Sequence, residues 1–147
     1  MPKDLKINID NVRLNIRVGV IFRHNNKFVI EISKEGRNSV VPGGRIKINE
    51  HSKDALVREI NEEMGFVINK NNLSLVKVFE NFFKYDLEDV HEIYFLYEYN
   101  LTEEEVNIIN NLNINYDNET TYFKLINNSD CDKYNLLPLE LHSIINK

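Results

Sequence analysis

Cysteine is almost absent from this chain: Cys131 is the only one among 147 residues. A lone cysteine cannot form a disulfide within the chain, and no Cys or His neighbour stands at zinc-ligand spacing from it. We therefore expect an incidental, partly buried thiol rather than a structural or metal-binding one.

Long apolar runs are also missing. No segment approaches the roughly 18 uninterrupted apolar residues that a membrane-spanning helix needs. The opening residues, MPKDLKINID, lack the apolar core of a secretory signal. We expect no association with a membrane and a cytoplasmic location.

Basic residues are outnumbered, with 18 Lys and Arg against 23 Asp and Glu and a net charge of −5. Nonspecific binding to DNA or RNA depends on a basic face that neutralises phosphates, so a nucleic acid polymer is not the expected partner. A small phosphorylated ligand remains compatible with an acidic protein when divalent cations lie between the two sets of negative charge.

The chain has no internal repeat, no Pro/Gly/Ser-rich linker and no long run of one charge sign. Its apolar content of 42% and charged content of 28% are those of an ordinary globular protein. A chain of this length fits one domain with a real core, so we expect a single domain over residues 1–147.

Local patterns predict a mixed β-sheet with helices packed against its faces, the α/β (α+β) class. A short apolar run at 38–44 is stopped by Pro42 and two glycines, which predicts a tight loop. Helices are expected at 52–64, ending at Gly65, at 102–112, and at 137–147 with Pro138 as the first residue. Strands are expected at 14–22 and 27–33, joined by a turn, at 73–83 and 91–99, joined by a turn around YDLED, and at 120–126.

Three glutamates stand close together in the helix expected at 52–64. Glu59, Glu62 and Glu63 occupy an arc of roughly 100°, beside an apolar stripe of Leu56, Ile60 and Met64. Like charges at this spacing typically cost roughly 0.2–0.5 kcal/mol. One interpretation is a solvated helix face. The other is a site for Mg²⁺ or Mn²⁺, which prefer oxygen ligands and would supply the positive charge that the glutamates lack.

Residues 42–66 read PGGRIKINEHSKDALVREINEEMGF. Gly44, then Glu50, then Arg58-Glu59, Glu62-Glu63 and Gly65 stand at the spacing of the Nudix box, which this segment resembles over 44–66. The one departure is Phe66, where the family usually has an aliphatic residue. More loosely, the chain from about Leu14 to Ile145 is similar to bacterial MutT-like Nudix proteins.

The resemblance implies an α/β/α sandwich with a mixed β-sheet. It also implies Mg²⁺- or Mn²⁺-dependent hydrolysis of the pyrophosphate bond in a nucleoside diphosphate derivative, with a nucleoside triphosphate or a nucleotide sugar as the first choice. The strand at 27–33 has no arginine pair like that of MutT-type enzymes, which weakens a claim for oxidised dGTP. The alternative is a non-catalytic Nudix domain that binds a nucleotide as a sensor or partner module. Many relatives are dimers, so a homodimer stays open.

The resemblance also implies roles for individual residues. Glu59 and Glu63 are expected as the principal metal ligands, and Glu62 as a further ligand or through a bound water. The Gly43 carbonyl is expected as an extra ligand, and Glu50 as a contact to the metal or its water. Arg58 is expected to orient the glutamates by hydrogen bonding.

The general base is left open between a box glutamate, Glu92 and Glu80. His91 is expected to be a structural hydrogen-bonding residue. Gly44 and Arg45 are the candidates for contact with substrate, with Arg45 meeting a phosphate. Two other arginines, Arg17 and Arg23, are weaker candidates.

Overall fold

The computed structural model describes residues 2–146. The strands are β1 (Lys6–Ile9), β2 (Val12–His24), β3 (Lys27–Ser33), β4 (Ser39–Val40), β5 (Gly43–Arg45), β6 (Ser74–Tyr85), β7 (Glu88–Asn100) and β8 (Thr121–Asn127). The helices are α1 (Ser52–Met64), α2 (Glu103–Asn110) and α3 (Glu140–Ile145), with short 3₁₀ turns η1 (Lys70–Asn72) and η2 (Asn128–Asp130).

Strand β2 is the centre of one mixed sheet. It runs parallel to β7 and antiparallel to β1, β3 and β5, while β6 pairs with β7, and β4 and β8 pair with β3. The β2–β3 hairpin pairs only two residues on each strand before the strands separate. Beyond that point β5 pairs with β2 in place of β3. Strands β2 and β3 are therefore separated where Gly43 and Gly44 lie.

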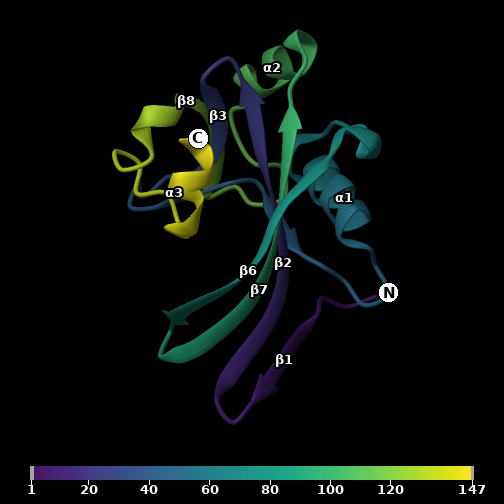
Figure 1. Ribbon diagram of the computed structural model, residues 1–147, viewed down its shortest axis with the longest axis vertical. Coiled ribbons are helices and arrows are strands. Elements are labelled where there is room, and N and C mark those ends of the chain that lie inside the picture. Colours follow the sequence, from purple (N-terminus) through teal and green to yellow (C-terminus); the bar gives the residue numbers. More distant parts are fainter. Residues whose placement is uncertain (1, 147) are drawn as a thin grey trace.

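Apolar side chains cover both faces of this sheet. One cluster joins β2 to α1 and α2 through residues such as Val20, Leu56 and Ile109. The other joins the opposite face to α3 through residues such as Ile30 and Leu141. Figure 1 shows α1 and α3 on opposite sides of the central strands. The expected α/β/α sandwich with a mixed sheet is therefore confirmed.

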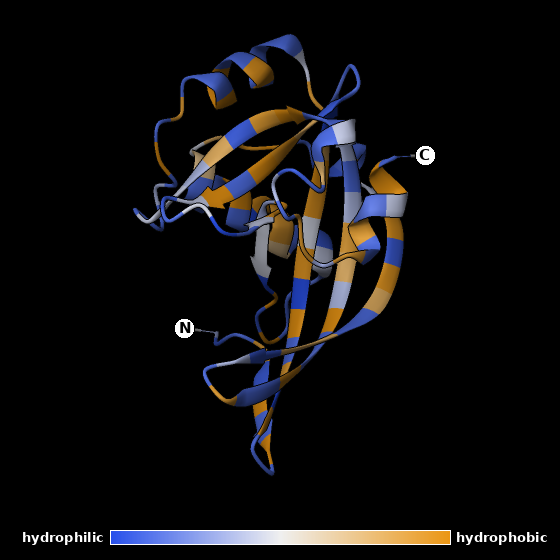
Figure 2. Ribbon diagram, turned by 90° about the vertical axis from the view of Figure 1, so that its left-hand side faces the viewer, coloured by the Kyte–Doolittle hydropathy of each residue, from blue (hydrophilic) through white to orange (hydrophobic). Residues whose placement is uncertain are grey.

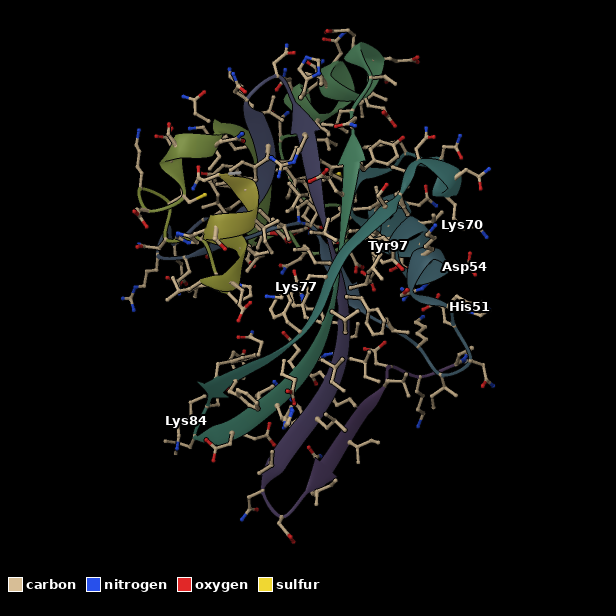
Figure 3. The ribbon with its side chains drawn as sticks, viewed as in Figure 1. His51, Asp54, Lys70, Lys77, Lys84 and Tyr97 are labelled. Carbon is tan, nitrogen blue, oxygen red and sulfur yellow. The ribbon has the colours of Figure 1, made fainter. Side chains whose placement is uncertain are left out.

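Helix α1 has the bounds expected from its sequence. Its apolar stripe is buried, and Gly65 adopts φ +77°, with its N–H donating to the Asn61 carbonyl. A left-handed residue after the last turn is the usual end of a helix, and glycine adopts it without a Cβ clash. At the other end, the Ser52 hydroxyl lies 2.5 Å from the hydroxyl of Tyr97, which is labelled in Figure 3, and this contact joins α1 to β7.

The ends of the chain differ from expectation in two ways. Strand β1 was not predicted, although its four residues, KINI, alternate polar and apolar side chains; all four are exposed. The closing helix begins at Glu140 rather than at Pro138. The Leu137–Pro138 peptide is cis, and the Pro138 carbonyl accepts from the N–H of Leu141 in the turn before the helix.

Cys131 is buried in the α3-side cluster. None of the helices among the described residues is long and apolar enough to cross a membrane.

Candidate functional site

The two glycines of β5 permit close contacts on both sides of that strand. Gly43 pairs with Gly19 of β2, and a Cβ on Gly43 would lie 2.1 Å from the Val18 carbonyl oxygen. A Cβ on Gly44 would lie 2.3 Å from the carboxyl carbon of Glu59. Since no real Cβ tolerates such distances, the absence of side chains lets the Glu59 carboxylate lie directly against the backbone of β5.

Arg58 connects the helix to the loop before it. Its Nε and Nη2 donate to the two oxygens of Glu50 at 2.8 and 3.0 Å, and Nη2 also donates to the Arg45 carbonyl at 3.1 Å. Nη1 donates to Glu59 at 2.9 Å and only weakly to Glu62, at 3.4–3.5 Å. The hydrogen bonds from Arg58 lower the pKa of Glu50. Arg58 thus fixes Glu50 and Glu59, while Glu62 stays exposed.

Glu63 points away from Arg58, into the protein. It is 7% exposed, and its Oε2 accepts from the Asn115 side-chain nitrogen at 2.9 Å. The same nitrogen donates to Oε2 of Glu31 at 2.9 Å. Burial raises the pKa of Glu63 to about 8; nearby Glu31 and Glu59 add to the rise, and the Asn115 hydrogen bond opposes it. A neutral amide therefore holds two buried acidic groups that repel each other.

The donor set around Glu63 suits a hard divalent cation. Within residues 2–146, no three His, Cys, Asp or Glu side chains are already arranged closely enough to hold a metal ion. Nevertheless Oε1 of Glu63 is buried and has no hydrogen-bond partner among the described residues. Burial also raises the pKa of Glu59, against the lowering effect of Arg58. Carboxylates that lack positive partners in a buried site are what Mg²⁺ or Mn²⁺ would compensate.

Arg17 of β2 brings positive charge to the same region. It lies opposite Arg45 in the β2–β5 register, so the two arginine side chains project from the same face of the sheet. Arg17 is half-buried. Burial lowers the pKa of its guanidinium, but neighbouring acidic groups raise it, and the net shift is upward. In order of effect, these groups are Tyr94, Glu92, Glu31 and Glu63.

Glu92 of β7 lies on the same face of the sheet as Arg17. It is 4% exposed, and its oxygens accept from the side chains of Asn15 and Asn81 at 3.3 and 3.4 Å. A cavity of about 160 Å³ opens beside it. Its lining residues are Arg17, Val40, Asn81, Phe83, Glu92, Tyr94, Leu137 and Pro138.

The other candidates from the sequence lie elsewhere. Glu80 and His91 hydrogen-bond each other at 3.0 Å and, by strand alternation, project from the opposite face of the sheet from Glu92. Arg23 donates to Glu98 and to backbone carbonyls of α3. It lines a cavity of about 720 Å³ at the β2–β3 turn, and no residue of the segment 44–66 is among the residues that line this cavity.

Two residues around Glu63, namely Glu31 and Asn115, were missed by reasoning from the sequence. Glu31 had a usable signal, because it is the only charged residue within the apolar run of β3 and a charge inside a buried strand needs a partner. Asn115 had none: it lies in a polar loop between α2 and β8, and only the fold brings it to Glu63. Arg17 also interrupts an apolar strand. Because several acidic groups surround it, Arg17 is a stronger candidate for contact with substrate than the sequence suggested.

The model of the NUDIX domain family matches residues 13–132. The chain belongs to this family. Family membership makes the chain a Nudix hydrolase. No curated protein sequence matches the chain significantly.

Solved structures share the Nudix fold at low sequence identity. A mutator MutT protein from Bacillus halodurans superposes with a TM-score of 0.68 and 15% identity, over 90% of this chain and 80% of that one. A MutT protein from Methanosarcina mazei Go1 gives 0.60 and 16%, over 90% and 91%. An Ap4A hydrolase from C. elegans, in a binary complex, gives 0.55 and 16%, over 92% of each chain. At these identities the likeness shows the fold.

Proposed function

We propose that this Nudix protein hydrolyses the pyrophosphate bond of a nucleoside diphosphate derivative with the help of Mg²⁺ or Mn²⁺. A nucleoside triphosphate or a nucleotide sugar is the favoured substrate. The observation that carries the proposal is the buried Glu63, which has one oxygen without a partner and lies beside Glu31 and Glu59. A purely structural helix face would not bury a carboxylate that has one oxygen without a hydrogen-bond partner.

Glu59 and Glu63 would hold the cation, with Glu62, the Gly43 carbonyl and Glu31 as further oxygen donors. Such a cation, when bound, neutralises charge on the phosphates and makes water easier to deprotonate. Both oxygens of Glu50 already accept from Arg58. We therefore assign Glu50 the task of holding Arg58, which in turn orients Glu59 against Gly44.

The substrate phosphates would bind at Arg17 and Arg45. Two arginines on the same face repel each other. Asp4, 3.9 Å from Arg45, offsets part of that repulsion, and a diphosphate placed between the arginines would remove the rest. Glu92 lines the same cavity as Arg17 and is fixed by Asn15 and Asn81. This arrangement supports a role for Glu92 in positioning the Arg17 guanidinium at the edge of the cavity.

In the reaction, the oxygen of a water molecule bonds to one phosphorus, and the bond from that phosphorus to the bridging oxygen breaks. The proton of the water passes to a carboxylate, and the leaving phosphate departs with the bridging oxygen. Glu62 suits the proton transfer best, because its side chain is 41% exposed and its contacts with Arg58 are long. Of the other two candidates, Glu92 is buried and already accepts two hydrogen bonds, and Glu80 hydrogen-bonds to His91 on the opposite face of the sheet.

We further infer that residues 1–147 make up one Nudix domain. The cytoplasm, where nucleotides and Mg²⁺ occur together, is the compartment that this activity requires.

The test is a panel of nucleoside triphosphates, nucleotide sugars, ADP-ribose and dinucleoside polyphosphates, incubated with the protein and Mg²⁺ or Mn²⁺. Release of phosphate, pyrophosphate or nucleoside monophosphate is measured for the wild type, for Glu63→Gln and for Glu104→Gln, an exposed glutamate of α2. We expect one substrate class to be turned over by the wild type and by Glu104→Gln, but not by Glu63→Gln. Nucleotide binding without turnover anywhere on the panel would instead favour a sensor module.

A further inference from the structure

Tyr94 of β7 lies directly beside Arg17 in the sheet. The two residues are partners in the β2–β7 register, so their side chains project from the same face. Figure 2 shows apolar and polar residues alternating along these long strands. Tyr94 is 2% exposed, yet it lines the cavity of about 160 Å³ together with Arg17 and Glu92. A buried tyrosine therefore faces the cavity at which Arg17 is proposed to bind the substrate phosphates.

The ring of Tyr94 is fixed by packing. It stacks on the ring of Phe79 in β6, with the ring centres 4.9 Å apart and 15° between the ring planes. Phe79 is itself buried. Stacked aromatic pairs in a core have little freedom to turn, so the position of the Tyr94 hydroxyl is determined by the fold.

The Tyr94 hydroxyl lies against Gly19, the next residue of β2 on the same face as Arg17. A Cβ on Gly19 would lie 2.2 Å from the hydroxyl oxygen and 2.9 Å from the ring carbon that bears it. Any larger residue at position 19 would therefore displace the hydroxyl. Gly19 pairs with Gly43, whose carbonyl is a proposed metal ligand. The missing side chain thus lets the hydroxyl lie on the backbone of β2, next to the glycine strand of the candidate site.

This hydroxyl has a hydrogen-bond donor beside it but no acceptor. Burial raises the pKa of Tyr94 and the charge of Glu92 adds to the rise, while Arg17 opposes it by its charge and as a hydrogen-bond donor. A guanidinium has no acceptor atom, so the hydroxyl oxygen accepts from Arg17 and its own proton stays free. Glu92 accepts its hydrogen bonds from Asn15 and Asn81. Within residues 2–146, Arg17 is the one hydrogen-bond partner of the hydroxyl.

The free proton indicates what the cavity binds. A buried tyrosine hydroxyl normally donates to an acceptor, and leaving it without one is costly. An oxygen acceptor inside the cavity would also meet the guanidinium of Arg17, which selects an oxygen that carries negative charge. Donation to such an oxygen is strengthened when the hydroxyl itself accepts from a cation. A phosphate oxygen satisfies both Arg17 and Tyr94.

We propose that the Tyr94 hydroxyl donates a hydrogen bond to a phosphate oxygen of the substrate, alongside Arg17. The hydroxyl keeps its proton throughout, so it binds the phosphate and takes no part in proton transfer. Tyr94 is then a substrate-binding residue outside the segment 44–66. The assignment rests on the proposed function, because it takes the cavity beside Arg17 as the place of the phosphates.

Binding of methylenediphosphonate with Mg²⁺ tests this contact without turnover, because its P–C–P bridge cannot be hydrolysed. Calorimetry gives Kd for the wild type, for Tyr94→Phe and for Tyr99→Phe. Tyr94→Phe removes the hydroxyl and keeps the stacked ring. A hydrogen bond to a charged group changes affinity by about 10- to 100-fold, so Kd should rise at least about 10-fold. An unchanged Kd, or a wild type that binds no diphosphonate at about 10 mM, would overturn the proposal.

Tyr99→Phe is the matched control. Tyr99 is a buried tyrosine of the same strand, and its hydroxyl donates to Glu105 of α2 at 2.8 Å. Tyr99 is not among the residues that line the cavity beside Arg17. This variant should lower Tm and leave Kd within about twofold. An equal rise in Kd for both variants would mean that the loss is a general effect of removing a buried hydroxyl.

The Arg17→Gln background separates direct contact from positioning. If the hydroxyl contacts the phosphate itself, Tyr94→Phe should still weaken binding by at least about threefold when residue 17 is already glutamine. If the second change costs nothing there, Tyr94 acts only through Arg17 and the proposal is wrong.

Kinetics on the substrate panel distinguish this proposal from the proposed function. Tyr94→Phe should lower kcat/KM by about the same factor as it weakens diphosphonate binding, mainly through KM. Turnover by the wild type that is unaffected in Tyr94→Phe would refute the contact and leave the hydrolase assignment in place. Diphosphonate binding that depends on Tyr94, with no turnover anywhere on the panel, would refute the hydrolase assignment and leave the contact in place.

Discussion

The carboxylate of Glu59 packs directly onto Gly44, so closely that a Cβ at residue 44 would lie 2.3 Å from the carboxyl carbon. Gly44→Ala must therefore displace Glu59 from the position in which Arg58 holds it. Misplacement of a catalytic group by an ångström costs on the order of 100-fold in rate, and we expect kcat/KM to fall by about that factor. Steady-state kinetics with the best substrate of the panel measures it.

The control is Gly36→Ala. At Gly36 a Cβ would meet nothing within 4 Å, but φ is +74°, so alanine costs about 1 kcal/mol of stability through backbone strain. This variant should melt earlier and keep full activity. Equal activity in the two variants would contradict the assigned role of the Gly44–Glu59 contact.

The Arg58–Glu50 pair predicts strong energetic coupling. The guanidinium donates to both oxygens of Glu50, and both side chains are largely buried. Arg58→Lys keeps the charge but loses the two-pronged geometry, and Glu50→Gln loses the carboxylate. We expect each single variant to lose about 1.5–3 kcal/mol in the free energy of unfolding, and the double variant to lose at least about 1 kcal/mol less than their sum.

Urea unfolding of the four proteins measures this coupling. The exposed Asp54–Lys70 pair, 2.9 Å apart and labelled in Figure 3, is the control. Its coupling should stay below about 1 kcal/mol. Additive losses at Arg58 and Glu50 would mean that the pair is not a unit.

Glu63 predicts a pH-dependent stability in the absence of metal. Its pKa in the fold is raised to about 8 from an ordinary value of 4.5. Protonation of Glu63 therefore favours the fold below pH 4.5, and that contribution is lost as the pH rises through about 8. Glu63→Gln mimics the protonated form, so in EDTA it should raise Tm at pH 8.5 by at least about 3 °C.

Thermal melts of both proteins across the pH range check the sign of this effect. The gain should shrink as the pH falls and vanish below about 4.5, where the wild-type group is protonated in both states. The same variant should lose turnover, so stability and activity move in opposite directions. A Glu63→Gln protein that is less stable at high pH would contradict the burial of an uncompensated charge.

Arg17 predicts an effect on phosphate binding. Arg17→Gln removes the guanidinium that lines the cavity together with Glu92 and Tyr94. We expect kcat/KM to fall by about 100- to 1,000-fold, the usual loss when one charged contact to a reacting group is removed. Arg23→Gln, on the same strand, serves as the control: Arg23 bonds to Glu98 and α3, so its loss should lower stability and leave kcat/KM within about twofold.

The roles proposed for Glu62 and Glu92 predict different changes in kcat and KM. A general base contributes about 100- to 10,000-fold to kcat, so Glu62→Gln should lower kcat with little change in KM. Glu92→Gln should resemble Arg17→Gln, and the two changes combined should cost little more than either alone, since one residue acts through the other. Additive losses from Glu92→Gln and Arg17→Gln would instead give Glu92 a role of its own.

Local signals in the sequence predicted much of the fold. The spacing of Leu56, Ile60 and Met64, followed by Gly65, predicts helix α1 from one short segment. The Asp86–Leu87 turn joins two strands that aromatic and branched residues already predicted. The closing helix was placed too early because Pro138 suits a helix start as well as the turn that it forms here. Strand β1 carried a signal that was missed, because Lys6-Ile7-Asn8-Ile9 alternates polar and apolar residues.

The candidate site was predictable only where it is local. Glu59, Glu62 and Glu63 share one helix, and their motif identifies them without any structure. Glu31 and Asn115 contact the Glu63 site from 32 and 52 residues away in the sequence. Contacts of that range depend on strand register and loop path, which periodicity does not encode.

Because one amide, that of Asn115, bridges Glu31 and Glu63, the candidate site can be completed only late in the synthesis of the chain. Glu31 and Glu63 leave the ribosome early, but the group that bridges them lies 52 residues after Glu63, in the segment that leads into β8. Until that segment is made and packed, the two carboxylates have nothing to hold them in place. A truncated or partly folded chain would therefore carry the complete motif and still be unable to act on the nucleotides around it.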